Sequence, residues 1–253
     1  TTFTDLYQSA KSSISEDIAI IKRTFEIQGI GIVNTLPGAA GGVIFTPKIK
    51  KEQALEAAQK ICDQMNDSTR LLPGGYIYLS DLLGKPDVLH HLGKMIASAY
   101  EDKKVDVIMT VATKGVPIAQ TVANYLNVPF VIVRRDSKIT EGATVSINYV
   151  SGSSSRVEKM ELSKRTLPSG SNVLIVDDFL KAGGTINGMR SLIQEFDSHA
   201  VGAVVFCESG VSGHQLQDYS SIIRITEINT ENQHIKAELG NFFDTHTFLE
   251  ETH

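Results

Sequence analysis

The chain has 253 residues, 42% of them hydrophobic and 21% charged, with 24 Lys plus Arg against 29 Asp plus Glu. This composition excludes a disordered or collagen-like chain. The net charge of -5 argues against a general polyanion binder, because nucleic-acid-binding proteins usually carry a basic footprint. Neither an apolar run of about 18 residues nor a signal sequence is visible, so we expect a cytoplasmic protein without a membrane anchor.

The charge is unevenly distributed along the chain. Residues 1–50 carry five basic and four acidic side chains, so the acidic excess lies in the remainder. This asymmetry is small, but it favours two joined units of different character. Cys62 and Cys207 lie far apart and are predicted to be reduced packing residues. The histidines, including His90 and His91, lack the spacing of metal ligands, so no metal site is predicted.

Two helices are predicted at the N-terminal end. Residues 2–10 are helix-prone, and because the chain starts with Thr1 rather than Met we expect a further segment upstream. Ser13 and Glu16 have the spacing of a capping box, which predicts that the second helix begins at Ser12 or Ser13. Its apolar residues recur every three or four positions, and Gly29 is its expected C-terminal cap.

A hairpin is predicted next, with strands at 31–35 and 43–46 around a Gly-rich turn. Helix, turn, helix and hairpin follow one another in the order of a winged helix-turn-helix, here over residues 1–48; a small packing subdomain is the alternative. The second helix presents short polar and basic side chains suited to DNA phosphates, although Glu16 and Asp17 oppose them. The candidate DNA-binding residues are Lys11, Ser12, Ser13, Ser15 and Lys22.

From residue 49 to 253 the pattern becomes α/β. Helices are predicted at 52–66, 87–100, 116–125 and 186–196, and strands at 105–111, 128–133, 144–150, 173–176 and 201–206. Continuous apolar runs such as Val-Leu-Ile-Val are typical of strands buried on both faces of a parallel sheet. Ligands of such sheets bind at the carboxyl ends of the strands.

One strand end carries the strongest chemical signal. The strand at 173–176 is followed by Asp177 and Asp178, which could accept hydrogen bonds from the two hydroxyls of a ribose. The glycine-rich turn that follows would present backbone amides, and the Thr185 hydroxyl, to a phosphate. A capped turn with two solvated carboxylates is the alternative.

Residues 173–185 resemble the phosphoribosyl pyrophosphate (PRPP) motif of type I phosphoribosyltransferases, whose fold has a central parallel sheet. The turn at 110–116 resembles the pyrophosphate-binding loop of that family, and the segments 134–138 and 149–165 resemble its basic segment and its mobile loop. The resemblance implies PRPP-binding residues, which are Tyr76, Thr113, Lys114, Gly115, Arg134, Lys138, Tyr149, Asp177, Asp178, Phe179, Lys181, Ala182, Gly183, Gly184 and Thr185.

The segments 11–17, 72–76, 140–154 and 177–185 together resemble the purine operon regulators of Gram-positive bacteria. Members of that family join a winged-helix domain to a phosphoribosyltransferase domain, and the resemblance extends from Ala10 to about Gly210. It implies a DNA-binding domain at 1–48, without its first helix, and an effector-binding domain at 49–253.

Two functions remain open. A regulator would bind PRPP, with Mg2+, as an effector and transmit its presence to operator DNA, and a guanosine polyphosphate could compete for the same amides. A purine phosphoribosyltransferase would transfer the phosphoribosyl group to a base. Ala182 stands where active family members commonly have Thr, but one lost hydrogen bond costs only about 1 kcal/mol. The additional N-terminal unit favours a catalytically inactive regulator, expected to be a homodimer because paired DNA sites match two-fold proteins.

Overall fold

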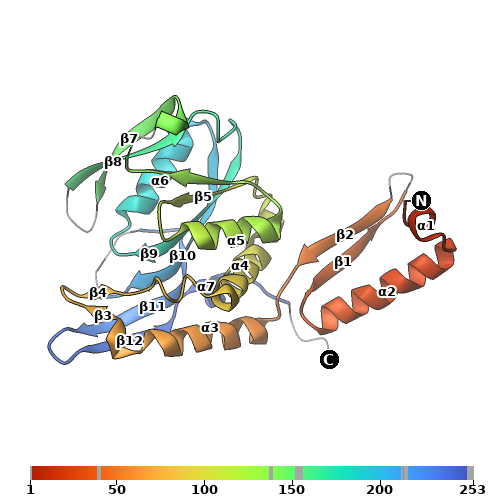
Figure 1. Cartoon of the computed structure of the whole chain (residues 1–253), viewed down its shortest axis with the longest axis horizontal. Coiled ribbons are helices and arrows are strands. Elements are labelled where there is room, and N and C mark those ends of the chain that lie inside the picture. Colours follow the sequence, from red (N-terminus) through yellow and green to blue (C-terminus); the bar gives the residue numbers. More distant parts are fainter. Residues whose placement is uncertain are drawn as a thin grey trace.

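A computed structural model describes residues 2–38, 41–136, 139–151, 156–211, 213 and 216–249 (Figure 1). In Figure 1 a short helix–hairpin unit extends to one side of a larger α/β body. The unit contains helices α1 (Thr2–Tyr7) and α2 (Lys11–Ile27) and the antiparallel strands β1 (Gly31–Leu36) and β2 (Gly42–Pro47). The order predicted for a winged helix-turn-helix is therefore observed.

The start of α2 differs from the prediction. The helix begins at Lys11, its N-cap is Ala10 in an extended conformation, and no side chain caps it. Ser13 therefore lies inside the first turn, and the expected capping box with Glu16 does not define the helix start. The C-terminal end is as predicted: Gly29 has a φ of 62°, and its N–H and that of Ile30 bond the carbonyls of Glu26 and Phe25. This pair of bonds is a Schellman motif.

A six-stranded sheet forms the centre of the α/β body, in the order β12–β11–β10–β9–β5–β6. All neighbouring strands are parallel except the edge pair β11 and β12. The strands are β5 (Val107–Val111), β6 (Phe130–Val133), β9 (Asn172–Leu180), β10 (His199–Ser209), β11 (Ser220–Asn229) and β12 (His234–Leu239). The predicted α/β class with a central parallel sheet is confirmed.

Alternate residues of β9 face two different cores. Leu174 and Val176 pack with helices α3 (Lys51–Met65), α4 (Pro86–Tyr100) and α5 (Val116–Leu126). Val173 and Ile175 pack on the opposite face, with α6 (Gly184–Glu195). All four side chains are fully buried, which explains the continuous apolar run in this strand.

The remaining elements border the sheet. They are the short pair β3 (Leu71–Leu72) and β4 (Tyr76–Ile77), the antiparallel pair β7 (Thr144–Ser151) and β8 (Arg156–Ser163), helix α7 (Phe242–Thr245), and single 3-10 turns at Ser68–Arg70, Glu101–Lys103 and Ile139–Glu141. Residues 156–163 were predicted to belong to a mobile loop; they instead form β8, paired with β7 along its length. The predicted Gly- and Ser-rich part of that loop, 152–155, lies outside the described residues.

Candidate functional site

A groove with a volume of about 550 Å³ opens at the carboxyl ends of the central strands. The groove lies between the adjacent strands β5 and β9, whose connections run to opposite sides of the sheet. β5 leads through α5 to β6, and β9 leads through α6 to β10. Such a switch point separates two strand-to-helix turns and leaves a crevice between them. Both turns, at 113–115 and 181–185, were predicted to bind ligand.

The turn after β9 lies along the groove. Its lining includes Lys181, Ala182, Gly183, Gly184 and Thr185. Gly183 has a φ of 86° and forms the N-cap of α6 without any side-chain cap. The left-handed conformation favours glycine at this position. The N-terminal amides of α6, together with the helix dipole, therefore form a site suited to a phosphate.

The two adjacent acids lie differently. Asp178 lines the groove, whereas Asp177 is only 5% exposed and lies behind it, with its Oδ1 accepting a hydrogen bond of 3.0 Å from the Asp178 N–H. Burial and the neighbouring Asp178 charge raise the pKa of Asp177 well above its ordinary value. Burial also raises the pKa of Asp178, an effect that its hydrogen bond with Asp177 and the Lys114 charge oppose. Asp178 is thus the carboxylate available to a ligand.

The turn after β5 places a cation, Lys114, in the groove, and its backbone lies close to β9 at Gly115. Lys114 lines the groove, while the neighbouring Thr113 is exposed. A Cβ atom at Gly115 would lie 2.3 Å from the Thr110 Oγ1 and 2.8 Å from the Asp177 Oδ1, so only glycine fits here. The turn after β5 therefore packs closely against strand β9 at Asp177.

An apolar wall closes one side of the groove. Tyr76, Ile77 and Leu79 come from β4 and the segment after it, and Phe179 from the end of β9. The Lys181 ammonium lies 5.9 Å from the centroid of the Tyr76 ring. The groove therefore combines a cationic, amide-rich floor with an apolar wall. Arg135, from the predicted basic segment 134–138, also lines the groove. The remaining lining residues, which were not among the predicted PRPP-binding residues, are Gly75, Ser151, Leu180, Ile186, Ser209, Val211 and Ile228.

The basic segment 134–138 was predicted to reach this site, and of its two arginines only Arg135 lines the groove. The Arg134 backbone continues β6 by pairing with Glu161 of β8, and its guanidinium contacts Glu141 at 3.2 Å, away from the groove. Arg135 extends to the opposite side and contacts Glu158 at 3.4 Å. Consecutive residues of an extended chain alternate sides. From sequence, this alternation could show only that the two arginines point to different sides. Which of them faces the groove depends on the pairing of Arg134 with Glu161.

Tyr149 also lies outside the lining. It is 7% exposed and packs in the α6 core, and its hydroxyl donates a 2.7 Å hydrogen bond to Glu158. Glu158 thus holds both Tyr149 and Arg135, which makes Tyr149 a support of the groove. Lys138 lies outside the described residues.

Four of the five candidate DNA-binding residues lie together at the start of α2. Lys11, Ser12, Ser13 and Ser15 are exposed on the first turns of α2, and Lys22 is exposed nearer its other end. Glu16 and Asp17 are exposed beside them. The surface is therefore accessible but of mixed charge.

Three further observations concern metal-binding groups, membrane helices and thiols. Within the described residues, no group of three or more His, Cys, Asp or Glu side chains could hold a metal ion, and no helix is long and apolar enough to span a membrane. Cys62 and Cys207 are buried free thiols, as expected.

The fold and the groove define a phosphoribosyltransferase domain preceded by a separate helix–hairpin unit. The "Phosphoribosyl transferase domain" family matches residues 79–240, and "Bacterial purine repressor, N-terminal" matches residues 1–47. Adenine phosphoribosyltransferase of Thermoanaerobacter pseudethanolicus is similar in structure, with a TM-score of 0.55 at 23% identity over 65% of this chain and 98% of that one.

The chain belongs to the family of bacterial purine biosynthesis transcriptional regulators. It is 58% identical to the "purine biosynthesis transcriptional activator PurR" of Lactococcus lactis, over 94% of this chain and 88% of that protein. It is 54% identical to the "purine biosynthesis transcriptional repressor PurR" of Bacillus subtilis, over 96% of this chain and 85% of that protein. Identity to xanthine phosphoribosyltransferase of Alkaliphilus metalliredigens is 30%, over 60% of this chain and 77% of the enzyme.

Proposed function

We propose that this chain is a regulator of purine biosynthesis genes that binds operator DNA through residues 1–48 and PRPP through residues 49–253. The single observation that carries the proposal is the union, in one chain, of an amide-rich groove at a strand switch point with an N-terminal unit matched by the purine repressor family. Names of the close relatives support the regulatory role.

Each part of PRPP has a counterpart in the groove. The 5-phosphate would bind the amides at the start of α6, with Thr185 adding a hydroxyl. Asp178 would accept hydrogen bonds from the ribose hydroxyls. The diphosphate would lie near Lys114 and Arg135, since these cations line the groove beside Asp178.

Mg2+ fits this site only if it binds together with the ligand. The described residues provide no cluster of three metal-binding side chains. Mg2+ commonly keeps several waters and binds through substrate phosphates with one or two carboxylates. Asp178, aided by bound water, is the residue that would hold it beside the diphosphate.

DNA binding is proposed for a homodimer, in which the first turns of α2 contact phosphates through Lys11, Ser12, Ser13 and Ser15, with Lys22 further along. The exposure of these side chains supports the assignment. Glu16 and Asp17 weaken the local attraction, so we expect the two subunits to share the binding energy.

The domain is proposed to be catalytically inactive, with a purine phosphoribosyltransferase as the second candidate. The family match over residues 79–240 and the relatives named phosphoribosyltransferases favour the second candidate. Ala182 in the phosphate turn and the helix–hairpin unit, which transferase chemistry does not need, favour the first.

The direction of regulation remains open, because related chains are named both activator and repressor. Linkage fixes one property: if PRPP changes DNA affinity by some factor, DNA changes PRPP affinity by the same factor. A guanosine polyphosphate would compete with PRPP, because its diphosphate could use the same amides.

The double substitution Asp177→Ala and Asp178→Ala tests the proposal. DNA fragments are first selected from a random duplex library with the full chain, and their affinity is then measured with and without PRPP. We expect the double variant to lose the PRPP effect and to keep its PRPP-free DNA affinity, while the exposed control Asp63→Ala behaves like the wild type. Nucleotide formation from PRPP and a purine base at enzymatic rates would instead support the transferase.

A further inference from the structure

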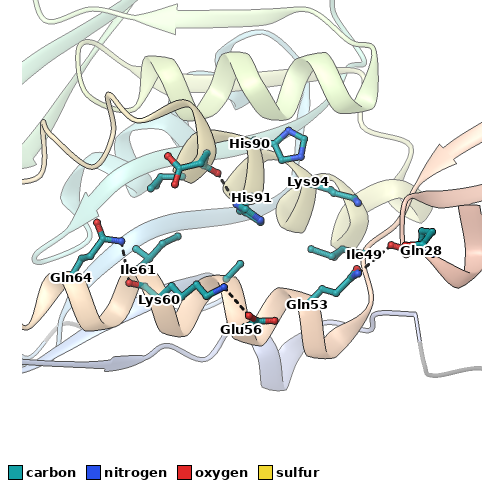
Figure 2. Close-up of a pocket in the computed structure, with 13 residues that line it drawn as sticks. Gln28, Ile49, Gln53, Glu56, Lys60, Ile61, Gln64, His90, His91 and Lys94 are labelled. Carbon is teal, nitrogen blue, oxygen red and sulfur yellow. Dashed lines mark hydrogen bonds and ion pairs between the residues drawn. The ribbon is translucent and has the colours of Figure 1, made fainter.

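The helix–hairpin unit meets the α/β body at a polar junction. A groove with a volume of about 280 Å³ runs between α3 and α4 and ends at the C-terminal end of α2 (Figure 2). Lys60, His91 and Lys94 line it together with Gln28 and other polar residues. Among its lining residues Gln28 belongs to the helix–hairpin unit and the others to the α/β body, so the groove reaches the boundary between the units at one end.

Two side chains of the α/β body hold the end of α2. The Lys94 ammonium, from α4, donates a 2.6 Å hydrogen bond to the carbonyl of Gly29. The Gln53 amide, from α3, donates one of 3.1 Å to the carbonyl of Gln28, as Figure 2 shows. A helix C-terminus carries partial negative charge, which a cation stabilises. Among the described residues Lys94 forms no ion pair, and its ammonium has one hydrogen-bond partner, the Gly29 carbonyl.

The Gly29 carbonyl lies at the hydrogen-bonded end of α2. Gly29 is the left-handed residue of the Schellman motif that ends this helix. A shift of Lys94 would therefore act directly on the end of α2. The opposite end of that helix carries the proposed DNA-binding residues Lys11 and Ser12.

The same helix α4 also holds the connection between the units. The Lys48 ammonium lies 2.6 Å from the Glu101 carboxylate just beyond α4 and 3.4 Å from the carbonyl of Ser98. The Ile49 N–H donates a 3.2 Å hydrogen bond to the Ser98 hydroxyl. All contacts of this paragraph are largely buried, so α4 anchors the linker firmly.

From α4 the contacts continue to the ligand groove. Helix α5 begins directly after Gly115, the last residue of the turn that contains Lys114. It packs on α4 so closely that a Cβ atom at Gly93 would lie 2.4 Å from the Thr121 Cγ2. One turn away, the Tyr125 hydroxyl bonds the His90 Nδ1 at 2.7 Å. Movement of the turn would thus reach the α4 segment that contains Lys94.

We propose that Lys94 is the residue through which ligand in the groove at the strand ends changes the DNA affinity of α2. This inference rests on the proposed function. Ligand binding draws the turn that contains Lys114 toward its diphosphate, α5 and α4 shift together, and the Lys94–Gly29 contact passes that shift to α2. Lys94 is a positioning residue, and it touches neither PRPP nor DNA.

Lys94→Met tests this inference in the full chain, because it keeps the apolar stem and removes the ammonium. The measured quantity is the ratio of the DNA dissociation constants with and without PRPP, and PRPP affinity is measured separately by calorimetry. We expect the ratio to move toward one by about fivefold, at the lower end of usual coupling factors. PRPP affinity in the absence of DNA should stay that of the wild type, and Lys94→Arg should restore the ratio.

The matched control is Lys60→Met. Lys60 lines the same groove, but its ammonium pairs with Glu56 on its own helix at 2.7 Å and both side chains are well exposed. A ratio unchanged in Lys94→Met, or moved toward one equally in Lys60→Met, overturns the inference.

A second variant covers the case in which Lys94→Met does not fold. Gln53→Ala removes the other contact with the end of α2 from an exposed position, and it should also move the ratio toward one. An unchanged ratio in that variant also counts against the inference. A wild-type chain that binds DNA without any response to PRPP would refute the proposed function itself, whereas a responding wild type with an equally responding Lys94→Met refutes only the coupling.

Discussion

The two units of the chain differ in how they bury apolar side chains. In β9 the four residues from Val173 to Val176 are fully buried, and they pack on both faces of the sheet. In α2 no residue is buried, and Ile20 and Ile21 are 65% and 44% exposed. Elements with few buried apolar contacts open at lower free energy than core strands.

The two units therefore depend on different interactions: the α/β body on close packing, and the orientation of α2 on hydrogen bonds. Close packing fixes the ligand groove, because both of its turns extend from buried strands. The orientation of α2 depends more on the polar contacts that Lys94 and Gln53 make with its end. A regulator needs this combination, since its sensor must hold a fixed shape while its DNA-binding unit can be re-oriented by small shifts.

The largest expected effect concerns the buried core. Leu174→Ala removes a fully buried side chain between β9 and the helices, and we expect it to lower the free energy of unfolding by about 2–5 kcal/mol. Ile20→Ala, on the exposed face of α2, should change it by less than about 0.5 kcal/mol. Chemical denaturation of the full chain compares the two. A loss at Ile20 equal to that at Leu174 would mean that this face of α2 is covered in solution.

A smaller change in the free energy of unfolding, this time an increase, is expected for a substitution of Asp177 at the ligand groove. Because the pKa of Asp177 is raised in the folded chain, the folded state holds a proton that the unfolded state releases. Stability is therefore lost as the pH rises above the ordinary pKa of about 4. Asp177→Asn removes that loss and should stabilise the chain by about 1 kcal/mol at pH 7, less at lower pH.

A second substitution provides the contrast for that prediction. The Arg70 guanidinium, 2.6 Å from the Asp81 carboxylate, holds the pKa of Asp81 below its ordinary value. Its contribution is present at neutral pH and lost as the pH falls through the lowered pKa. Asp81→Asn should therefore destabilise the chain at neutral pH, with the difference disappearing in acid. Thermal unfolding from about pH 2 to pH 8 covers the pH range of both effects, and parallel slopes for the two variants would contradict the assignment.

The sequence predicted those features that local pattern determines. The apolar run 173–176 marked a buried strand, and Gly183 and Gly184 marked the turn into α6, because a left-handed φ and a close backbone approach both favour glycine. Gly29 marked the end of α2 for the same reason. These signals depend on a few adjacent residues, so they can be interpreted without knowledge of the fold.

Features set by distant partners were missed. The segment 156–163 contains four charged residues, and its apolar residues Val157, Met160 and Leu162 do not follow a strict alternation. Its pairing with β7 makes it a strand. Arg134 and Arg135 could not be distinguished before the backbone pairing with Glu161 was known. The junction joins Lys94 to Gly29, 65 positions apart, so no local pattern indicates it.

The smallest expected effect lies in the helix–hairpin unit and concerns DNA rather than stability. Lys11→Gln should weaken DNA binding by a similar factor for all sequences, because a contact with phosphate carries no base information. The slope of log affinity against log salt should fall by about 0.9 for each lost contact, and by about twice that if both copies of Lys11 in a dimer touch DNA. Lys236→Gln, on β12 in the α/β body, is the matched control, since that ammonium pairs with Glu238 at 2.9 Å and should leave the slope unchanged. An unchanged slope in Lys11→Gln would remove α2 from the DNA interface. A reduced slope in Lys236→Gln would instead place phosphate contacts on the α/β body and erase the division of tasks between the two units.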